Sequence, residues 1–235
     1  MIINTYEKLS IFIDRWISGH IDLLLIQSEA GLGKSSLIQE KLKGRPHYAV
    51  NNYTTPLANY KQLYYNKDNL VWYDDVDLLL ANPIQIGIMK QICESKQIKK
   101  VCYETTSNLI GDVPMSFNST SKILISCNAV IGNNPHMRAI RDRAFFVQFQ
   151  PNRSEILTKM REIADNYPLL EEKEKEEVLR LIEYNAKNCK DLSLRSLIKG
   201  FQLFRYYKQK GIDWKEDLLK ELGLNEKLVV MNELM

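Results

Sequence analysis

A short glycine-containing segment of the sequence carries residue types that bind phosphate groups. The segment Ser28–Ser35 reads SEAGLGKS and follows an apolar run, Ile21–Gln27, that has the character of a strand buried on both faces. Glycines let backbone N–H groups turn toward phosphate oxygens, and the first turn of a following helix adds the positive end of its dipole. In such a loop, Lys34 reaches the β- and γ-phosphates of a nucleotide, and the Ser35 hydroxyl coordinates Mg²⁺. The segment predicts a site for ATP and Mg²⁺ made by Glu29, Ala30, Gly31, Leu32, Gly33, Lys34, Ser35 and Ser36.

The first position of this segment departs from the usual phosphate-loop pattern, G-x-x-x-x-G-K-[ST]. Ser28 stands where the pattern has glycine, but serine is small and the rest of the pattern is intact. The alternative interpretation is a chance Gly-Lys-Ser sequence in a turn. The strand expected before the segment and the helix expected after it favour phosphate binding.

Two acids end a second apolar run of the sequence. Leu70–Asp75 reads LVWYDD, and carboxylates at the end of a strand are suited to hold a metal ion and to orient water. We expect Asp74 to hold the water shell of Mg²⁺ opposite Ser35, and Asp75 to orient and polarise the attacking water. Adjacent like charges are unfavourable unless a cation lies nearby, which favours this interpretation. A solvated turn rich in aspartate is the alternative.

A third apolar run, Ile123–Asn128, ends in an amide. Beside a γ-phosphate, Asn128 is able to hydrogen-bond both the phosphate and the attacking water without adding a charge. Asparagine at the end of a strand is also common in turns, which is the alternative. The order of the motifs, with Asn128 after the two acids, favours a role at the nucleotide.

Arginines in two further segments are candidates for stabilising the transition state. Arg138, Arg141 and Arg143 lie in a short predicted helix before the apolar run Phe145–Phe149. Such residues either form structural salt bridges or act as an arginine finger, which neutralises charge during phosphoryl transfer. We expect Arg143 first, and Arg141 second, to be a finger supplied to a neighbouring subunit. Arg195 begins a later helix and either reaches the nucleotide or is an ordinary surface arginine.

Strands and helices are expected to alternate along the first part of the chain. Apolar runs predict five strands, at Ile21–Gln27, His47–Asn51, Asn69–Asp74, Lys122–Cys127 and Phe145–Phe149. Helical patterns are found at Tyr6–Ser18, Lys34–Leu42, Leu57–Tyr65 and Ile84–Glu94. This alternation predicts an α/β fold, a P-loop NTPase core with a five-stranded, mainly parallel sheet. After Pro151 only helical periodicity remains, so we expect a core over residues 1–151 and a helical lid over residues 152–235.

The overall composition is that of a globular protein and does not point to one class of partner. The 235 residues include 45% hydrophobic and 26% charged residues with a net charge of +3, a balance that does not by itself indicate nucleic-acid binding. The four cysteines and three histidines have no zinc-site spacing, which predicts reduced structural thiols. Neither a signal peptide nor a membrane-spanning run is recognised, so we expect a cytoplasmic protein with no membrane partner, in the host cytoplasm if the chain is viral.

The order of these motifs resembles that of the AAA+ ATPases over about residues 20–205. The resemblance rests on the segments GLGKS, VWYDD, ILISCN, RAIRDRAFFVQF and LSLRS. Within that group, the acid pair and Asn128, followed by Pro135 and Arg143, are similar to the superfamily 3 helicases of viruses and plasmids. The resemblance implies a Walker A role for Lys34 and Ser35 and a Walker B role for Asp74 and Asp75. It implies that Asn128 is sensor 1, Arg143 the arginine finger and Arg195 sensor 2. It also implies a homo-oligomeric ring, often hexameric, with ATP sites between subunits.

The resemblance further implies a hairpin before the sensor strand, with basic residues at its tip that hold DNA. The corresponding stretch is Lys99–Ser119, with Gly111-Asp112 as the turn. Its tip, Leu109–Asp112, has no lysine, arginine or histidine, and the lysines of this region lie at its base. This departure leaves a helicase and a helicase loader both open as interpretations.

We therefore expect an ATP-hydrolysing protein that acts on or beside DNA in the replication of a virus or mobile element, with a replication protein as a candidate partner. The alternative is a slow nucleotide-dependent switch that binds and regulates a protein. Asp75, in place of the commoner glutamate, favours a slow enzyme. The segment Leu218–Met235 predicts either a partner-binding helix or a frayed end.

Overall fold

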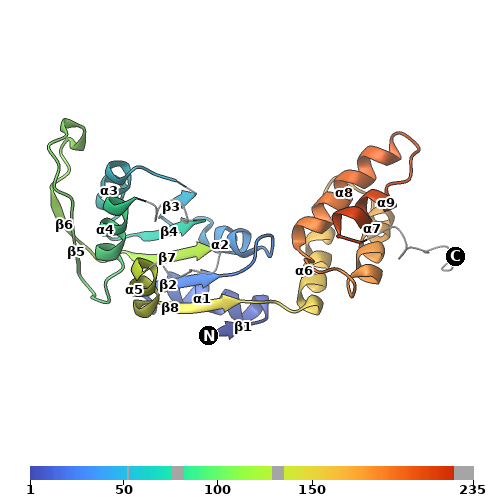
Figure 1. The fold of residues 1–235 in the computed structure, drawn as a ribbon, viewed down its shortest axis with the longest axis horizontal. Coiled ribbons are helices and arrows are strands. Elements are labelled where there is room, and N and C mark those ends of the chain that lie inside the picture. The colour runs from blue at the N-terminus through green and yellow to red at the C-terminus, as the bar shows by residue number, and fades with distance from the viewer. Residues whose placement is uncertain (52, 76–81, 129–134, 225–235) are drawn as a thin grey trace. The chain divides into compact units, whose positions relative to one another are not determined.

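The computed structural model describes residues 1–235 except 52, 76–81, 129–134 and 225–235 (Figure 1). The described residues form two compact units. One unit comprises Met1–Glu29 and Gly33–Gln150, and the other comprises Ala30–Leu32 and the chain from Pro151 onward. The sequence predicts a division after residue 151 but gives no sign that Ala30–Leu32 groups with the second unit.

A six-stranded sheet is the centre of the first unit. Its strand order is β1-β8-β2-β7-β4-β3, and every neighbouring pair is parallel. The strands are β1 (Ile2–Ile3), β2 (Leu23–Gln27), β3 (His47–Asn51), β4 (Leu70–Asp74), β7 (Lys122–Cys127) and β8 (Phe145–Phe149). All five strands expected from apolar runs are present, but the prediction of a five-stranded sheet is wrong because β1 adds a sixth. Its two residues pair with Gln148 and Phe149, and so short a strand produces no periodic pattern in the sequence.

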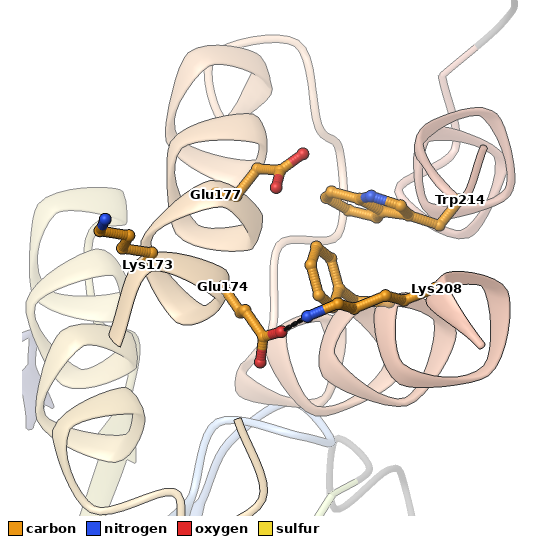
Figure 2. A pocket seen from close by; sticks show the side chains of 6 residues that line it. Lys173, Glu174, Glu177, Lys208 and Trp214 are labelled. Carbon is orange, nitrogen blue, oxygen red and sulfur yellow. Dashed lines mark hydrogen bonds and ion pairs between the residues drawn. The ribbon is translucent and has the colours of Figure 1, made fainter. Parts of the chain in front are cut away.

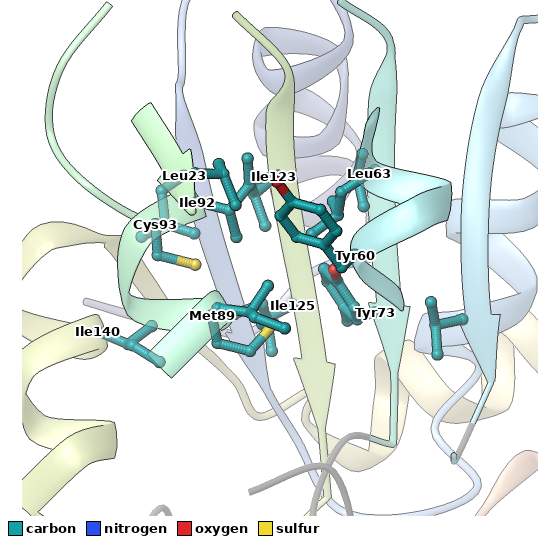
Figure 3. Close-up of a cluster of buried hydrophobic side chains, with 14 of the residues drawn as sticks. Leu23, Tyr60, Leu63, Tyr73, Met89, Ile92, Cys93, Ile123, Ile125 and Ile140 are labelled. Carbon is teal, nitrogen blue, oxygen red and sulfur yellow. The ribbon is translucent and has the colours of Figure 1, made fainter. Parts of the chain in front are cut away.

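Apolar side chains on both faces explain why the central strands are buried. Every residue of β2 is buried, and so is every residue of β7 after Lys122. Helices cover both faces of a parallel sheet, so its central strands have continuous apolar sequences. On one face, Tyr73 and Ile125 of the sheet meet Met89 and Ile140 in a core cluster (Figure 3).

The helices of this unit follow the predicted positions closely. Within the described residues they are α1 (Tyr6–Ile17), α2 (Lys34–Leu42), α3 (Pro56–Tyr65), α4 (Pro83–Ile92) and α5 (Pro135–Arg143). Thr5, Thr55 and Asn82 accept hydrogen bonds from first-turn N–H groups of α1, α3 and α4, which fixes where these helices begin.

The strand order brings the ends of three strands to one edge of the sheet. β7 lies between β2 and β4, with Cys127 opposite Gln27 and Ser126 opposite Asp74. The chain leaves β2 through α2 toward β3 on one side, whereas it leaves β7 through α5 toward β8 on the other side. The carboxyl ends of β2 and β7 therefore form a topological switch point, which is where open α/β sheets bind ligands.

A β-hairpin follows α4, as the resemblance implies. β5 (Lys99–Cys102) and β6 (Ser116–Ser119) pair antiparallel, and the loop between them contains the 3-10 helix η2 (Asn108–Ile110) followed by Gly111 with a φ of 64°. Tyr60 of α3 holds the hairpin, because its hydroxyl donates to Pro114 O at 2.7 Å and its ring packs against two hairpin aromatics, Tyr103 and Phe117. The loop also lies against α3, where Lys61 Nζ donates to Leu109 O at 2.9 Å.

The second unit is helical throughout its regular elements. Within the described residues these are α6 (Arg153–Asp165), α7 (Glu172–Asn185), α8 (Leu194–Lys208) and α9 (Lys215–Glu221). Gly200 lets α7 and α8 approach closely, since a Cβ at this position would lie 2.8 Å from Val178 Cγ1. The predicted segment Leu218–Met235 is described as far as Leu224, and residues 225–235 lie outside the described part. None of the helices that the structure describes has the length and apolar character needed to cross a bilayer.

Candidate nucleotide-binding site

The loop after β2 leads into a helix whose first turn has no side-chain cap. Ser28 N–H donates to Cys127 O at 3.2 Å, which continues the sheet one residue beyond β2. Gly33 is the N-cap of α2, with a left-handed φ of 78° that favours glycine, and it forms no side-chain cap hydrogen bond. The first-turn N–H groups of α2 therefore lack the side-chain acceptor that α1, α3 and α4 have. Such groups, at the positive end of a helix, are suited to bind an anion.

Lys34 is buried next to a neutral amide. The residue is 6% exposed, and its Nζ donates to Asn128 Oδ1 at 2.5 Å. None of the ion pairs found among the described residues includes Lys34. Removing an ammonium from water is costly unless an anion compensates for the lost hydration. Within the described residues, the hydrogen-bond partner of the Lys34 ammonium is therefore a neutral amide rather than a carboxylate.

Asp74 receives hydrogen bonds from two hydroxyl groups. Ser35 Oγ donates to Asp74 Oδ1 at 3.0 Å, and Ser126 Oγ donates to the same oxygen at 2.6 Å. Trp72 Nε1 in turn donates to Ser126 Oγ at 2.9 Å, which directs the serine hydroxyl toward the carboxylate. The carboxylate is thus held in one orientation by neighbouring strands β4 and β7 and by the first turn of α2.

Asp75 has an unusual backbone conformation. Its φ is 52°, and it is the one residue other than glycine with a positive φ in the described part of the chain. Its N–H donates to Ser126 O at 3.0 Å, and its Oδ1 accepts a hydrogen bond from Asn128 Nδ2 at 2.5 Å. A left-handed conformation costs roughly 1–2 kcal/mol for an ordinary L-residue, and strain of this kind is concentrated at functional sites. The conformation gives Asp74 and Asp75 different partners although they are adjacent in sequence.

The structure joins five of the predicted site residues, together with Ser126, in two short hydrogen-bonded chains. One links Asp75 through Asn128 to Lys34, and the other links Ser35 through Asp74 to Ser126. Sequence reasoning missed Ser126, which lies in β7 two residues before Asn128 and opposite Asp74 in the parallel register. The remaining loop residues differ in exposure, since Glu29, Ala30 and Ser36 are exposed, Gly31 and Gly33 are half-buried, and Leu32 is buried.

The candidate finger arginines lie at the opposite edge of the sheet. Arg143 lies two residues before Phe145, the first residue of β8. Phe145 pairs with Leu24, near the start of β2. Its Nη1 donates to Lys90 O at 3.3 Å, near the end of α4, and Arg141 lies over the ring of Phe146 with 4.2 Å between Cζ and the centroid. A strand of five residues spans roughly 16 Å, so neither arginine belongs to the carboxyl-edge cluster of its own chain.

Arg195 and the middle of the loop belong to the second unit. Arg195 is exposed in the first turn of α8, and Leu194 N–H donates to Gly31 O at 2.9 Å. A Cβ at Gly31 would lie 3.1 Å from Ser193 Cβ and 3.3 Å from Arg195 Cδ, and its φ of 79° also disfavours other residues. Glycine at this position therefore allows the close approach of Ala30–Leu32 to the start of α8.

The donor set at Asp74 fits a magnesium ion that is shared with a phosphate ligand. Within the described residues there is no group of three or more His, Cys, Asp or Glu side chains that would hold a metal alone. Mg²⁺ is commonly held by one or two protein oxygens together with water and substrate phosphates, at about 2.0–2.1 Å in an octahedron. Adjacent ligands of such an octahedron are about 2.9 Å apart, close to the 3.0 Å between Ser35 Oγ and Asp74 Oδ1.

A pocket in the second unit is lined by other residues. It has a volume of about 350 Å³ and lies between α7, α8 and α9 (Figure 2). Among its charged side chains, Glu174 forms an ion pair with Lys208. The rings of Phe204 and Trp214, which also line the pocket, pack edge to face. The pocket contains none of the residues predicted to bind nucleotide.

No protein-family model matches the chain, and no curated protein matches its sequence.

Proposed function

We propose that this chain binds ATP with Mg²⁺ at the β2–α2 loop and hydrolyses it. The proposal rests on Lys34, a buried residue whose ammonium has a neutral partner and which lies at the start of a helix without a side-chain cap. A triphosphate supplies the negative charge that this cation and the first-turn N–H groups of α2 require. The neighbouring contact between Ser35 and Asp74 suits the Mg²⁺ that accompanies a triphosphate.

Each residue of the two hydrogen-bonded chains has a role in the proposed reaction. Lys34 binds β- and γ-phosphate oxygens, for which it gives up part of its contact with Asn128. Asp74, oriented by Ser126, holds the metal or its water, and the bound Mg²⁺ neutralises charge on the phosphates. Asp75 accepts a hydrogen bond from the attacking water and orients it toward the γ-phosphate. Asn128 keeps the Asp75 carboxylate in position and donates a hydrogen bond at the γ-phosphate.

The position of Arg143 supports an assembly in which subunits complete one another's sites. At the amino edge of its own sheet, Arg143 is remote from Lys34, so a finger role requires a second copy of the chain. This agrees with the resemblance to AAA+ ATPases, whose sites lie between the subunits of a ring. We propose that the chain works as such a homo-oligomer.

The resemblance to superfamily 3 helicases supports action on or beside DNA. In this proposal the β5–β6 hairpin faces the nucleic acid, and Lys61, held beside the hairpin loop, contributes a basic group that the tip itself lacks. A helicase and a helicase loader both fit this arrangement.

An ATPase assay with and without single- and double-stranded DNA tests the proposal. We expect Mg²⁺-dependent hydrolysis that DNA stimulates, and loss of hydrolysis in Lys34→Ala and Arg143→Ala but not in Lys41→Ala, a matched control on the same helix. An equal mixture of the two inactive variants should recover part of the activity if the arginine acts across subunits. Hydrolysis by Lys34→Ala at the rate of the unaltered chain would overturn the proposal.

A second candidate is a slow nucleotide-dependent switch that regulates a protein partner. The hairpin tip favours it, because Leu109 is 74% exposed there and Met115 is 52% exposed nearby. Exposed apolar groups of this kind suit a protein surface better than a phosphate backbone. The switch predicts a low rate of hydrolysis that DNA leaves unchanged.

A further inference from the structure

A large groove lies beside the hairpin in the first unit. It has a volume of about 1010 Å³, with one wall formed by α4 and the other by the end of β5 and the residues after it. Exposed Ile84 and Met115 provide apolar contacts, and the charged groups that line the groove are Lys100 and Glu104. The lining therefore has no net charge and does not overlap the proposed nucleotide site.

The edge of β5 that borders the groove is open for backbone pairing beyond Cys102. Tyr103 N–H donates to Met115 O across the hairpin, so the backbone groups of Cys102 and Glu104 point to the other side, toward the groove. The side chain of Gln91 hydrogen-bonds the backbone of Cys102 as a neighbouring strand would. Its Oε1 accepts from Cys102 N–H at 2.6 Å, and its Nε2 donates to Cys102 O at 3.3 Å. Within the described residues, the backbone of Glu104 has no such partner.

A glycine in the opposite wall leaves room for another backbone. Gly87 lies in the middle of α4, where glycine weakens a helix relative to alanine, and its φ is not in the left-handed region. A Cβ at Gly87 would meet no described atom within 4 Å, so packing inside the unit does not require glycine here. Gly87 lines the groove, so the absence of a side chain leaves the backbone of α4 accessible there.

We propose that this groove binds the C-terminal segment of a second copy of the chain as an added strand. Residues 225–235 (NEKLVVMNELM) follow Leu224 and span up to roughly 36 Å when fully extended. The run Leu228–Met231 is apolar and rich in β-branched valine, so it suits strand pairing. It also carries no charge, which matches the neutral lining of the groove. Its backbone pairs with Glu104 and passes over Gly87.

A labelled peptide of residues 225–235 tests this inference directly, without nucleotide. Fluorescence anisotropy is measured with the full chain carrying Val230→Asp, which disables its own segment. We expect saturable binding that a scrambled peptide does not reproduce and that Gly87→Gln weakens at least tenfold. Gly87→Gln should melt at or above the temperature of the parent chain, which separates a blocked groove from a misfolded one. Undiminished binding by Gly87→Gln, or equal binding of the scrambled peptide, would overturn the proposal.

Sedimentation of the unlabelled full chain tests whether the segment comes from a second copy. Self-association should weaken to a similar degree in Val230→Asp and in Gly87→Gln, since each removes one side of the same contact. Gly87→Ala is the matched control, because it adds helix propensity with a smaller side chain. Self-association that is unchanged in both Val230→Asp and Gly87→Gln would exclude the proposed contact between copies.

Discussion

Replacing Lys34 by methionine tests whether this lysine is needed for ligand binding or for the stability of the fold. With a residue exposure of 6% and a neutral partner, Lys34 loses hydration that no ion pair among the described residues restores. Its charged hydrogen bond to Asn128 returns about 1.5–3 kcal/mol. Methionine removes both contributions at similar length, and water can replace the lysine at the half-buried Asn128. We therefore expect the free energy of unfolding without nucleotide to stay level or rise by up to about 2 kcal/mol.

Urea unfolding with and without MgATP measures both consequences of this substitution. The unaltered chain should gain about 2.7 kcal/mol when ATP is present at one hundred times its Kd, whereas Lys34→Met should gain nothing. Lys41→Met is the matched control on the same helix, where the exposed ion pair with Asp14 contributes at most about 1 kcal/mol and the nucleotide effect should persist. A loss of stability in Lys34→Met by more than about 1 kcal/mol, with the nucleotide effect retained, would refute this reasoning.

Four further substitutions test particular contacts. Asp75→Asn should keep nucleotide affinity, because asparagine tolerates the left-handed conformation, but lower turnover about a hundredfold or more; an unchanged rate would remove Asp75 from catalysis. Ser126→Ala should cost about 1–3 kcal/mol in urea unfolding, since it leaves Asp74 and Trp72 without a shared partner, and a neutral effect would contradict that contact. Gly200→Ala should lower the thermal midpoint, because overpacking between α7 and α8 costs about 1–3 kcal/mol of stability. An unchanged midpoint would argue against close packing of these helices. Burial raises the pKa of Cys93 from 9.0 to about 12, so the contribution of this thiol to stability is complete below pH 9 and is lost as the pH rises toward 12. Cys93→Val should therefore make the free energy of unfolding in urea less dependent on pH between pH 9 and 11. An unaltered dependence on pH would contradict the raised pKa.

The elements that carry the candidate site could be predicted because their sequences are strongly patterned. β2, β4 and β7 are apolar runs buried on both faces, and polar residues mark the ends of all three. The order of these strands in the sheet has no comparable signal in the sequence. It is this order that brings Asn128 between Lys34 and Asp75.

Other features of the site depend on tertiary context and were not predictable. The pairing of Ser126 with Asp74 follows from the parallel register of β4 and β7, which a single sequence does not specify. The positive φ of Asp75 has no local signal, since aspartate adopts this conformation only occasionally. The remoteness of Arg143 from its own site follows from the parallel direction of β8.

Calorimetric titration of ATP into the purified chain, in Mg²⁺ and again in excess chelator, tests the central claim most directly. The proposal assigns to Lys34 and the first turn of α2 an attraction for phosphates in both conditions, and to Ser35 and Asp74 a contribution only through the metal. We predict saturable binding in Mg²⁺ that weakens at least tenfold in chelator and is lost in Lys34→Met. Absence of any magnesium-dependent affinity for ATP or another nucleoside triphosphate would contradict the account.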